Sequence, residues 1–478
     1  MKRSLRLVTS LLLLLVMAAV AVPLALHLTP SVIAALDPPP PPAPPVIPEA
    51  QRPPTAVSTP DVVGPLSATA PAPDPGVLAS QLDAAVELTG PGDVAGMVLD
   101  ASDGTVLYER AATRAQAPAS NIKVVTAAAL MTYARPEETL STSVLLAPGT
   151  PEVLYLRGGG DVLLASGASD PDAVVGRAGL GTLAAETAAA LPEASGPYTV
   201  HLDETLFSGS NLNPTWAAGD ISAGEIAPLH PLAITSGWLE EGATAGPRSQ
   251  DAGLDAARSF VADLTAAAAE RGITVETDVQ RRAAPEGAEE LAAVESAPLI
   301  EQMQRMLEVS DNYLAESLAR VAAVRSGRPG SVGGAAEAMR AAAVGLGVPP
   351  EGLVLGDAAG LSSRNAVSPE QLARLLRGVV TSDEPSLALV TDSLPIAGLT
   401  GTLSTRFTSG ALPAPGAGVV RAKTGTLNAV SALSGHVVTA DGRLLVFSFL
   451  AGGLDGNTAD ARAAVDRAAA VLAECGCR

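Results

Sequence analysis

A proline-rich stretch constrains the folding of this chain more than any other feature. Residues 37–76 contain 15 prolines in 40 positions. Proline lacks a backbone N–H and fixes φ, so such a segment favours extended polyproline II structure over helices or sheets and cannot bury a core. We therefore predict a disordered linker over 37–76. At about 3.1 Å per residue it would reach on the order of 120 Å.

The segment before this linker has the pattern of an export signal. Lys2, Arg3 and Arg6 precede an apolar run over 7–26. A basic start followed by an apolar stretch is typical of secretory signals, and this run is also long enough to span a bilayer. Residues 1–36 are accordingly predicted to be a signal peptide or an N-terminal transmembrane anchor. Either one places the rest of the chain in the cell envelope, outside the cytoplasm.

The charge and the metal-binding residue types exclude several function classes. The net charge is −20, so no basic surface is expected that could neutralise the phosphates of a nucleic acid. The four histidines and two cysteines show no spacing typical of metal ligands. We predict no nucleic-acid partner, no metal and no organic cofactor.

Two hairpin signals predict an antiparallel sheet. Asp103-Gly104 and Asp441-Gly442 each lie between alternating apolar runs, and this pattern is typical of tight β-hairpins. The segments between these hairpins are largely helical. The sequence therefore predicts an α+β fold with one antiparallel sheet, built from both ends of the folded part and flanked by helices.

A central region has a different organisation. From about residue 146 to residue 290, short strands alternate with alanine-rich helices and glycine-rich loops. We predict an α/β inserted domain over 146–290. The remaining segments, 77–145 and 291–478, are predicted to form one further domain.

Lysine usage points to chemistry. The chain has three lysines, Lys2, Lys123 and Lys423, and its other basic residues are arginines. Ser120 precedes Lys123 by three positions on a predicted apolar helix, so the two side chains share a face. A serine nucleophile needs a base, and a lysine can be that base if burial lowers its pKa. We interpret Ser120 as a nucleophile and Lys123 as its base. The alternative is a solvated lysine near a helix start.

Ser310-Asp311-Asn312 lies between two predicted helices. The Ser310 hydroxyl could relay a proton to a leaving amine, and the Asn312 amide could hold a substrate carbonyl. The alternative interpretation is helix capping, since all three residue types are favoured caps.

Lys423-Thr424-Gly425-Thr426 ends a predicted strand. Lys423 and the Thr424 hydroxyl could receive a carboxylate, Gly425 permits a close backbone approach, and the Thr426 N–H could point at an oxyanion. The alternative is an ordinary exposed strand end.

The order S-x-x-K, S-D-N, K-T-G resembles that of penicillin-binding proteins and class A β-lactamases. The 190 positions between Ser120 and Ser310 exceed the spacing in class A β-lactamases. With "GGGD" (158–161), "LDETLFSG" (202–209), "DAAGLSSRN" (357–365) and "LPIAGLTGTL" (394–403), residues 78–474 resemble the class C low-molecular-mass penicillin-binding proteins. These are the D-alanyl-D-alanine carboxypeptidase/endopeptidase family of penicillin-binding protein 4, peptidase family S13.

The resemblance implies a penicillin-binding, β-lactamase-like fold and a serine-type D-Ala-D-Ala carboxypeptidase/endopeptidase. Such an enzyme trims peptidoglycan stem peptides or crosslinks through an acyl-enzyme, here on Ser120, and β-lactams acylate the same serine. The implied catalytic residues are Ser120, Lys123, Ser310, Asn312 and Lys423, and the implied substrate-binding residues are Thr424, Gly425 and Thr426. Asp311 is implied to support its turn.

Two details of the resemblance concern single residues. The family usually has Asp-Gly-Ser-Gly-Leu-Ser, whereas this chain has Ala358 and Ala359 between Asp357 and Gly360, so a serine hydroxyl that could support the site is missing. In the family an acidic residue of the insertion can bind the free amine of a diamino acid. Asp203 or Glu204 is the candidate here, and the alternative is a plain strand-end charge.

Two other functions compete with the carboxypeptidase. A β-lactamase would need a base for its deacylating water, but no Glu-x-x-Leu-Asn occurs between Asn312 and Lys423, since Glu316, Glu351 and Glu370 all fail the pattern. A non-catalytic wall-binding module with a decayed site is disfavoured by the intact Ser120 and Lys123.

The sequence also predicts that Lys123→Arg abolishes acylation, whereas Lys423→Arg only weakens it, because arginine stays protonated but can still bind an anion.

Overall fold

The structure, a computed structural model, describes residues 69–408 and 415–475, together with the single positions 15, 17 and 19. The predicted export signal or anchor over 1–36 lies outside the described residues, apart from those three positions, and so does the predicted linker up to residue 68. No helix among the described residues combines the length and the apolar composition that crossing a membrane requires.

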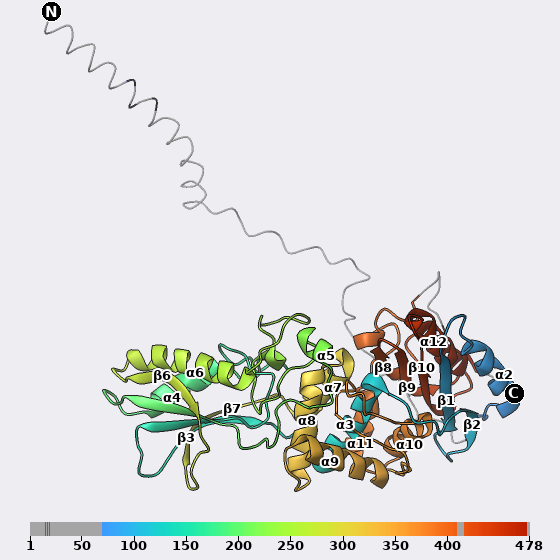
Figure 1. The fold of residues 1–478 in the computed structure, drawn as a ribbon, viewed down its shortest axis with the longest axis horizontal. Coiled ribbons are helices and arrows are strands. Elements are labelled where there is room, and N and C mark those ends of the chain that lie inside the picture. The colour runs from blue at the N-terminus through green and yellow to red at the C-terminus, as the bar shows by residue number, and fades with distance from the viewer. Residues whose placement is uncertain (1–14, 16, 18, 20–68, 409–414, 476–478) are drawn as a thin grey trace, which may run out of the picture. The chain divides into compact units, whose positions relative to one another are not determined.

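The first sheet has the strand order β2-β1-β10-β9-β8, and all neighbours are antiparallel. Both predicted hairpins are confirmed, and β1 pairs with β10, so the two ends of the folded part share this sheet (Figure 1). Strand β8 lies at one edge. The strands are β1 (Asp93–Asp100), β2 (Val106–Arg110), β8 (Arg421–Leu427), β9 (Val430–Val438) and β10 (Leu444–Gly452).

Side-chain alternation along β10 gives this sheet two buried faces. Phe447 and Phe449 pack with α2 (Pro75–Ala85) and α12 (Thr458–Glu474), while Val446 on the other face belongs to the larger core. Asp74 caps α2 by accepting the N–H groups of the first turn, and Pro75 is its first residue, a position where proline fits. This helix therefore begins within the last two positions of the predicted linker.

The larger core surrounds a helix that is buried on every side. Helix α8 (Asn312–Arg325) is buried from Tyr313 to Ala323, as expected of a helix in the centre of a large core. Helices packed with it in this core include α3 (Ile122–Tyr133) and α9 (Val332–Gly345) (Figure 1). Further helices and turns are α5 (Ala218–Ser222), α7 (Leu299–Val309), α10 (Pro369–Val380), α11 (Pro385–Asp392), and the 3-10 turns η2 (Ala119–Asn121), η3 (Thr235–Gly237) and η4 (Gly401–Leu403).

The second sheet has the order β6-β5-β4-β3-β7 and is mixed. Strands β4, β5 and β6 are parallel, and parallel neighbours need crossover connections, which contain α4 (Leu180–Ala190) and α6 (Ala252–Ala269). Both helices pack on the sheet in a separate core. The strands are β3 (Ser141–Leu146), β4 (Val153–Arg157), β5 (Tyr198–Asp203), β6 (Val275–Arg281) and β7 (Glu289–Glu295). This sheet thus extends a few residues beyond 146–290 at both ends.

Candidate active site

Ser120 lies in η2, the short turn that leads directly into α3. The expected contact with Lys123 is present, because Lys123 Nζ lies 2.9 Å from Ser120 Oγ. The Lys123 side chain is 0% exposed, while Ser120 is only half-buried, so a substrate can reach the hydroxyl. The alternative of a solvated lysine is therefore wrong.

The Lys123 amine has two further partners. Its Nζ donates to Asn312 Oδ1 at 2.7 Å and to the carbonyl oxygen of Ala359 at 2.6 Å. Burial lowers the pKa of Lys123 to about 8, although the charges of Asp357 and Asp311 act in the opposite direction. A lysine with this pKa can be neutral near physiological pH, and only the neutral amine can accept a proton from serine.

In the Ser310-Asp311-Asn312 motif, one residue caps a helix and the other two contact the buried lysines. Asp311 caps α8 by accepting the Leu314 N–H, as the alternative interpretation expects. Ser310 ends α7 in the left-handed region, with φ +61°, which few residues other than glycine adopt. Ser310 Oγ accepts a hydrogen bond from Lys423 Nζ at 3.0 Å, and Asn312 faces Lys123. The motif thus places one polar side chain against each lysine.

Residues from the predicted inserted domain hold this motif in place. Ser236 Oγ donates to Asp311 Oδ2 at 2.6 Å, and Asn312 Nδ2 donates to the Glu225 carbonyl oxygen at 3.0 Å. Because the Asn312 amide nitrogen faces Glu225, its oxygen faces Lys123. A cavity of about 280 Å³ adjoins the motif and is lined by residues that include Glu225, Trp238, Arg248, Arg305, Ser310 and Asn312.

Lys423 lies in edge strand β8 and is also 0% exposed, so the alternative of an exposed strand end is wrong for this residue. Its Nζ donates to Ser310 Oγ and to the Thr424 carbonyl oxygen. Burial, and then the nearby charge of Lys123, lower the pKa of Lys423 well below its usual value. The Thr424 hydroxyl lies 2.7 Å from the Thr402 hydroxyl of η4, so the receptor expected from two residues has a third one beside it.

Gly425 lies close to another part of the chain, and the absence of a side chain permits this approach. A Cβ at this position would lie 2.7 Å from Asn121 Nδ2 and 3.0 Å from the Pro118 carbonyl oxygen. The turn that carries Ser120 therefore packs directly against β8 at Gly425. Thr426 is the next residue of the same strand and is exposed.

Two carboxylates that are not among the predicted site residues hold the loop that contacts Lys123. Glu316 Oε1 accepts the N–H groups of Ala358 and Ala359, and Asp357 accepts those of Gly360, Leu361 and Ser362. Glu316 follows Asn312 by one helical turn. The sequence feature that could have identified it is an acidic residue among the apolar residues of a helix. Position 359, where the family usually has a serine, contacts Lys123 through its backbone carbonyl oxygen.

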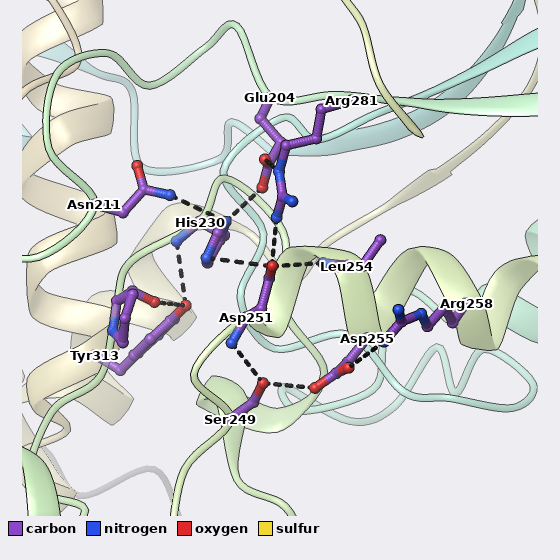
Figure 2. Close-up of polar contacts among 11 residues, drawn as sticks. Glu204, Asn211, His230, Ser249, Asp251, Leu254, Asp255, Arg258, Arg281 and Tyr313 are labelled. Carbon is purple, nitrogen blue, oxygen red and sulfur yellow. Dashed lines mark hydrogen bonds and ion pairs between the residues drawn. The ribbon is translucent and has the colours of Figure 1, made fainter. Parts of the chain in front are cut away.

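Asp203 and Glu204, the candidates for binding a diamino acid, are engaged within the protein. Asp203 pairs with Arg157, and Glu204 pairs with Arg281 and lies 2.5 Å from His230 Nδ1. Figure 2 shows Glu204, His230, Asp251 and Arg281 in one network, with the Tyr313 hydroxyl bonded to the His230 backbone. These contacts form an ion-pair cluster at the end of β5. Among the described residues, no group of three His, Cys, Asp or Glu side chains could hold a metal ion.

Known proteins are similar to this chain over most of its length. A profile of the D-Ala-D-Ala carboxypeptidase 3 (S13) family matches residues 78–252 and 241–474. Carboxypeptidase DacB of Mycolicibacterium smegmatis is 35% identical over 427 residues, which cover 89% of this chain and 90% of that protein. The D-alanyl-D-alanine carboxypeptidase of an Actinomadura species is 30% identical over 446 residues, covering 76% of this chain and 79% of that protein.

Solved structures agree with the fold. Penicillin-binding protein 4 from Haemophilus influenzae has a TM-score of 0.63 at 21% identity, and the match covers 82% of this chain and 98% of that one. The same protein complexed with a β-lactam has a TM-score of 0.60 at 20% identity, with the same coverage. This likeness confirms the predicted α+β fold. By the family profile and by relatives of nearly full length, the chain belongs to the D-Ala-D-Ala carboxypeptidase 3 (S13) family and is a serine-type D-Ala-D-Ala carboxypeptidase, as its three motifs predict.

Proposed function

We propose that Ser120 is the residue acylated by the substrate and that neutral Lys123 accepts its proton. The observation that carries the proposal is the 2.9 Å contact between Lys123 Nζ and Ser120 Oγ, at a lysine whose burial lowers its pKa to about 8. The substrate is a peptidoglycan stem peptide ending in D-Ala-D-Ala, or a crosslink between stems. In this site Ser120 Oγ attacks the carbonyl carbon of the penultimate D-alanine, and its proton passes to Lys123 Nζ.

The terminal carboxylate of the peptide binds at Lys423 and Thr424 in this proposal. Strand β8 is the edge of its sheet, which supports an extended peptide lying beside it. Gly425 keeps the Ser120 turn against this strand, so the N–H groups of Ser120 and Thr426 can together stabilise the oxyanion of the tetrahedral intermediate.

Ser310 and Asn312 complete the reaction. When the tetrahedral intermediate collapses, the bond to the last D-alanine breaks and the leaving nitrogen takes a proton from Ser310 Oγ–H. The proton that Lys123 took from Ser120 replaces the one that Ser310 gives up, so Lys123 is neutral again before deacylation, and the contact with Lys423 Nζ holds Ser310 Oγ in place. Asn312 orients Lys123 and receives the substrate amide. Water then attacks the ester carbon, Lys123 takes the proton of the water, and Ser120 regains its hydroxyl.

β-Lactams acylate the same serine in this proposal, because their ring amide mimics the terminal dipeptide. The β-lactam complex of the H. influenzae relative, whose fold this chain shares, supports that assignment. Neither Glu316 nor Glu370 is presented to Ser120 as a water-activating base. Glu316 is fully buried and bonded to backbone N–H groups, and Glu370 pairs with Arg374. This arrangement favours a long-lived penicilloyl adduct over rapid turnover.

Peptidoglycan lies outside the cytoplasm, so the chain works in the cell envelope. We propose that residues 1–36 export it, that the apolar run over 7–26 anchors it in the membrane, and that the residues of 37–76 before α2 act as a tether. The intact mass of the mature protein and its partition into the membrane fraction test the anchor. A mature chain that lacks residues 1–26 would show a cleaved signal instead.

One comparison tests the proposed chemistry. The full-length protein and its Ser120→Ala variant are incubated with labelled penicillin and with a pentapeptide ending in D-Ala-D-Ala. We expect a stable adduct and release of D-alanine from the wild type and neither from the variant. Rapid penicillin turnover would instead indicate a β-lactamase, and a wild type without any adduct would indicate a non-catalytic module.

A further inference from the structure

Glu316 is a buried carboxylate that the mechanism above does not use. It is 2% exposed and lies on α8, one turn after Asn312. Burial, and then the charge of Asp357, raise its pKa to about 8. Burying a carboxylate is costly unless hydrogen bonds compensate, and here Oε1 accepts two of them, from Ala358 N at 2.7 Å and from Ala359 N at 2.9 Å.

The loop that receives these bonds contacts both members of the Ser120–Lys123 pair. A Cβ at Gly360 would lie 2.2 Å from the Ala119 carbonyl oxygen and 2.9 Å from Ser120 N, so the loop packs directly against the turn of the nucleophile. From the same loop, the Ala359 carbonyl oxygen accepts from Lys123 Nζ at 2.6 Å. Movement of this loop would therefore displace the amine, the hydroxyl, or both.

Two carboxylates fix the direction of that carbonyl. In a planar trans peptide the C=O and the following N–H point in opposite directions. Asp357 Oδ1 holds the Gly360 N–H at 2.9 Å, so the Ala359 C=O of the same peptide unit points away from Asp357 and toward Lys123. Glu316 holds the two N–H groups that precede this unit. Together the two carboxylates clamp the loop from residue 358 to residue 362.

The direction of the Ala359 carbonyl determines where the lone pair of a neutral Lys123 amine points. A neutral amine has two N–H groups and one lone pair. Lys123 Nζ has three neighbours, of which Asn312 Oδ1 and the Ala359 carbonyl oxygen can only accept. Both N–H groups are used on these two oxygens, so the lone pair faces the third neighbour, Ser120 Oγ. If the Ala359 carbonyl turned away, the lone pair would lose its fixed direction.

We propose that Glu316 is a positioning residue for the Ser120–Lys123 pair, which aims the lone pair of Lys123 by holding the amides of Ala358 and Ala359. This inference rests on the proposed role of Lys123 as the base. It assigns the effect of Glu316 to its acceptor oxygen and not to its charge.

Two uncharged substitutions of similar size test whether Glu316 acts through an oxygen that accepts hydrogen bonds. Glu316→Gln keeps an oxygen that can accept both amides, whereas Glu316→Met has none, and both remove the charge. We expect the acylation rate constant with a β-lactam to stay within about threefold of wild type in E316Q. In E316M we expect a fall of about 100-fold, the size typical of a misplaced reacting group. The dissociation constant of the non-covalent complex should change less than about threefold in both, because neither substitution touches the expected carboxylate receptor.

A matched control and a second variant keep the test decisive. Asp161 is another buried carboxylate that accepts a backbone N–H, that of Leu163, but in a different loop, and D161N should acylate like wild type. If E316M does not fold, as its melting curve would show, E316D replaces it. Aspartate withdraws the carboxylate by about 1.5 Å, one C–C bond, and we expect the same loss although the charge is retained.

The outcomes are separable. Wild-type acylation in E316M, or an equal loss in E316Q and E316M, overturns the proposal. A wild type that is not acylated, or a Lys123→Met variant that acylates at the wild-type rate, defeats the proposed function itself. The inference fails on its own when acylation depends on Lys123 but does not distinguish Gln from Met at position 316.

Discussion

Lys123 Nζ lies 2.7 Å from Asn312 Oδ1, although 189 positions separate the two residues. Asn312 is the first residue of α8, and Lys123 is the second residue of α3, so the contact joins the ends of two buried helices. Because Asn312 also donates to Glu225, the amine of the Ser120–Lys123 pair is linked through one side chain to the predicted inserted domain over 146–290. We therefore expect substitutions around this pair to change proton transfer, carboxylate binding and the stability of the predicted inserted domain.

Substitution of Lys123 by arginine should abolish acylation. Arginine stays protonated in proteins and cannot take the proton of Ser120, and its larger side chain must also fit a fully buried site. We expect at least about a 10³-fold lower rate of labelling by penicillin, in line with the loss of a general base. Normal labelling of this variant would remove the role of Lys123 as a base.

Lys423→Arg should cost more than the sequence alone predicts. The sequence treats Lys423 as a carboxylate receptor, which arginine could replace with a modest loss. In the structure Lys423 is fully buried and donates to Ser310 Oγ. Overpacking a core forces neighbouring side chains and backbone to shift, and a small displacement of reacting groups can cost about 100-fold in rate, so we expect labelling about 10- to 100-fold slower than wild type. A rate within twofold of wild type would show that the site tolerates the larger group.

The acylation rate should depend on pH through Lys123. Its pKa is about 8, lowered from 10.5 by burial. Only the neutral amine accepts a proton, so the rate should rise about tenfold per pH unit below 8 and level off above it. Stopped-flow measurement of acylation between pH 6 and about 10 checks this. A rate that keeps rising toward pH 10 would indicate a lysine with its ordinary pKa and would contradict the burial argument.

Thr402→Val should weaken substrate binding without slowing the chemistry. The Thr402 hydroxyl lies 2.7 Å from that of Thr424, and valine keeps the volume but removes the partner. One lost hydrogen bond is worth about 1 kcal/mol, so we expect KM for a D-Ala-D-Ala peptide to rise about fivefold at nearly constant kcat. Thr408→Val, at an exposed threonine, is the control. An equal change in both variants would leave Thr402 without a role.

Loss of the Glu204 carboxylate should destabilise the inserted region. Burial acts to raise the pKa of Glu204, but its bonds to His230 and Arg281 outweigh this and hold the pKa below 4.5. A lowered pKa means that the stabilisation is present above pH 4.5 and is lost as the pH falls through the folded value. We expect Glu204→Gln to cost about 1–3 kcal/mol at neutral pH, and less in acid.

Thermal unfolding of wild type and Glu204→Gln at neutral pH and well below pH 4.5 measures this difference. Glu301→Gln breaks the more exposed pair with Arg177 and should cost less than about 1 kcal/mol. A gap between wild type and E204Q that stays constant down to low pH would contradict the electrostatic origin of the effect.

Short-range patterns carried the correct predictions. The hairpins at Asp103-Gly104 and Asp441-Gly442, the helix after Ser120, and the Ser120–Lys123 contact all follow from spacings of a few residues. Such spacings determine which neighbouring side chains face each other, and this local geometry depends little on distant segments. The family resemblance then joined motifs that no local rule connects.

The unpredicted parts depend on segments that are far apart in the chain. Glu316 and the 357–362 loop are brought together by the burial of α8, and Ser236 reaches Asp311 from the second sheet region. Gly425, one of the predicted substrate-binding residues, also packs against the turn of Ser120. In each case the partner is a backbone group or a common side chain, which leaves no pattern in the sequence.

The amino-acid sequence therefore determines which groups can react, because proton acceptance requires a lysine and acylation requires a hydroxyl within one helical turn of it. Folding decides how these groups are aimed and charged. The pKa of Lys123 depends on the loss of water around α3, and the direction of its lone pair depends on Asn312 and the Ala359 carbonyl. Desolvation and hydrogen-bond direction are properties of the packed core, and they do not exist until segments more than a hundred residues apart have come into contact.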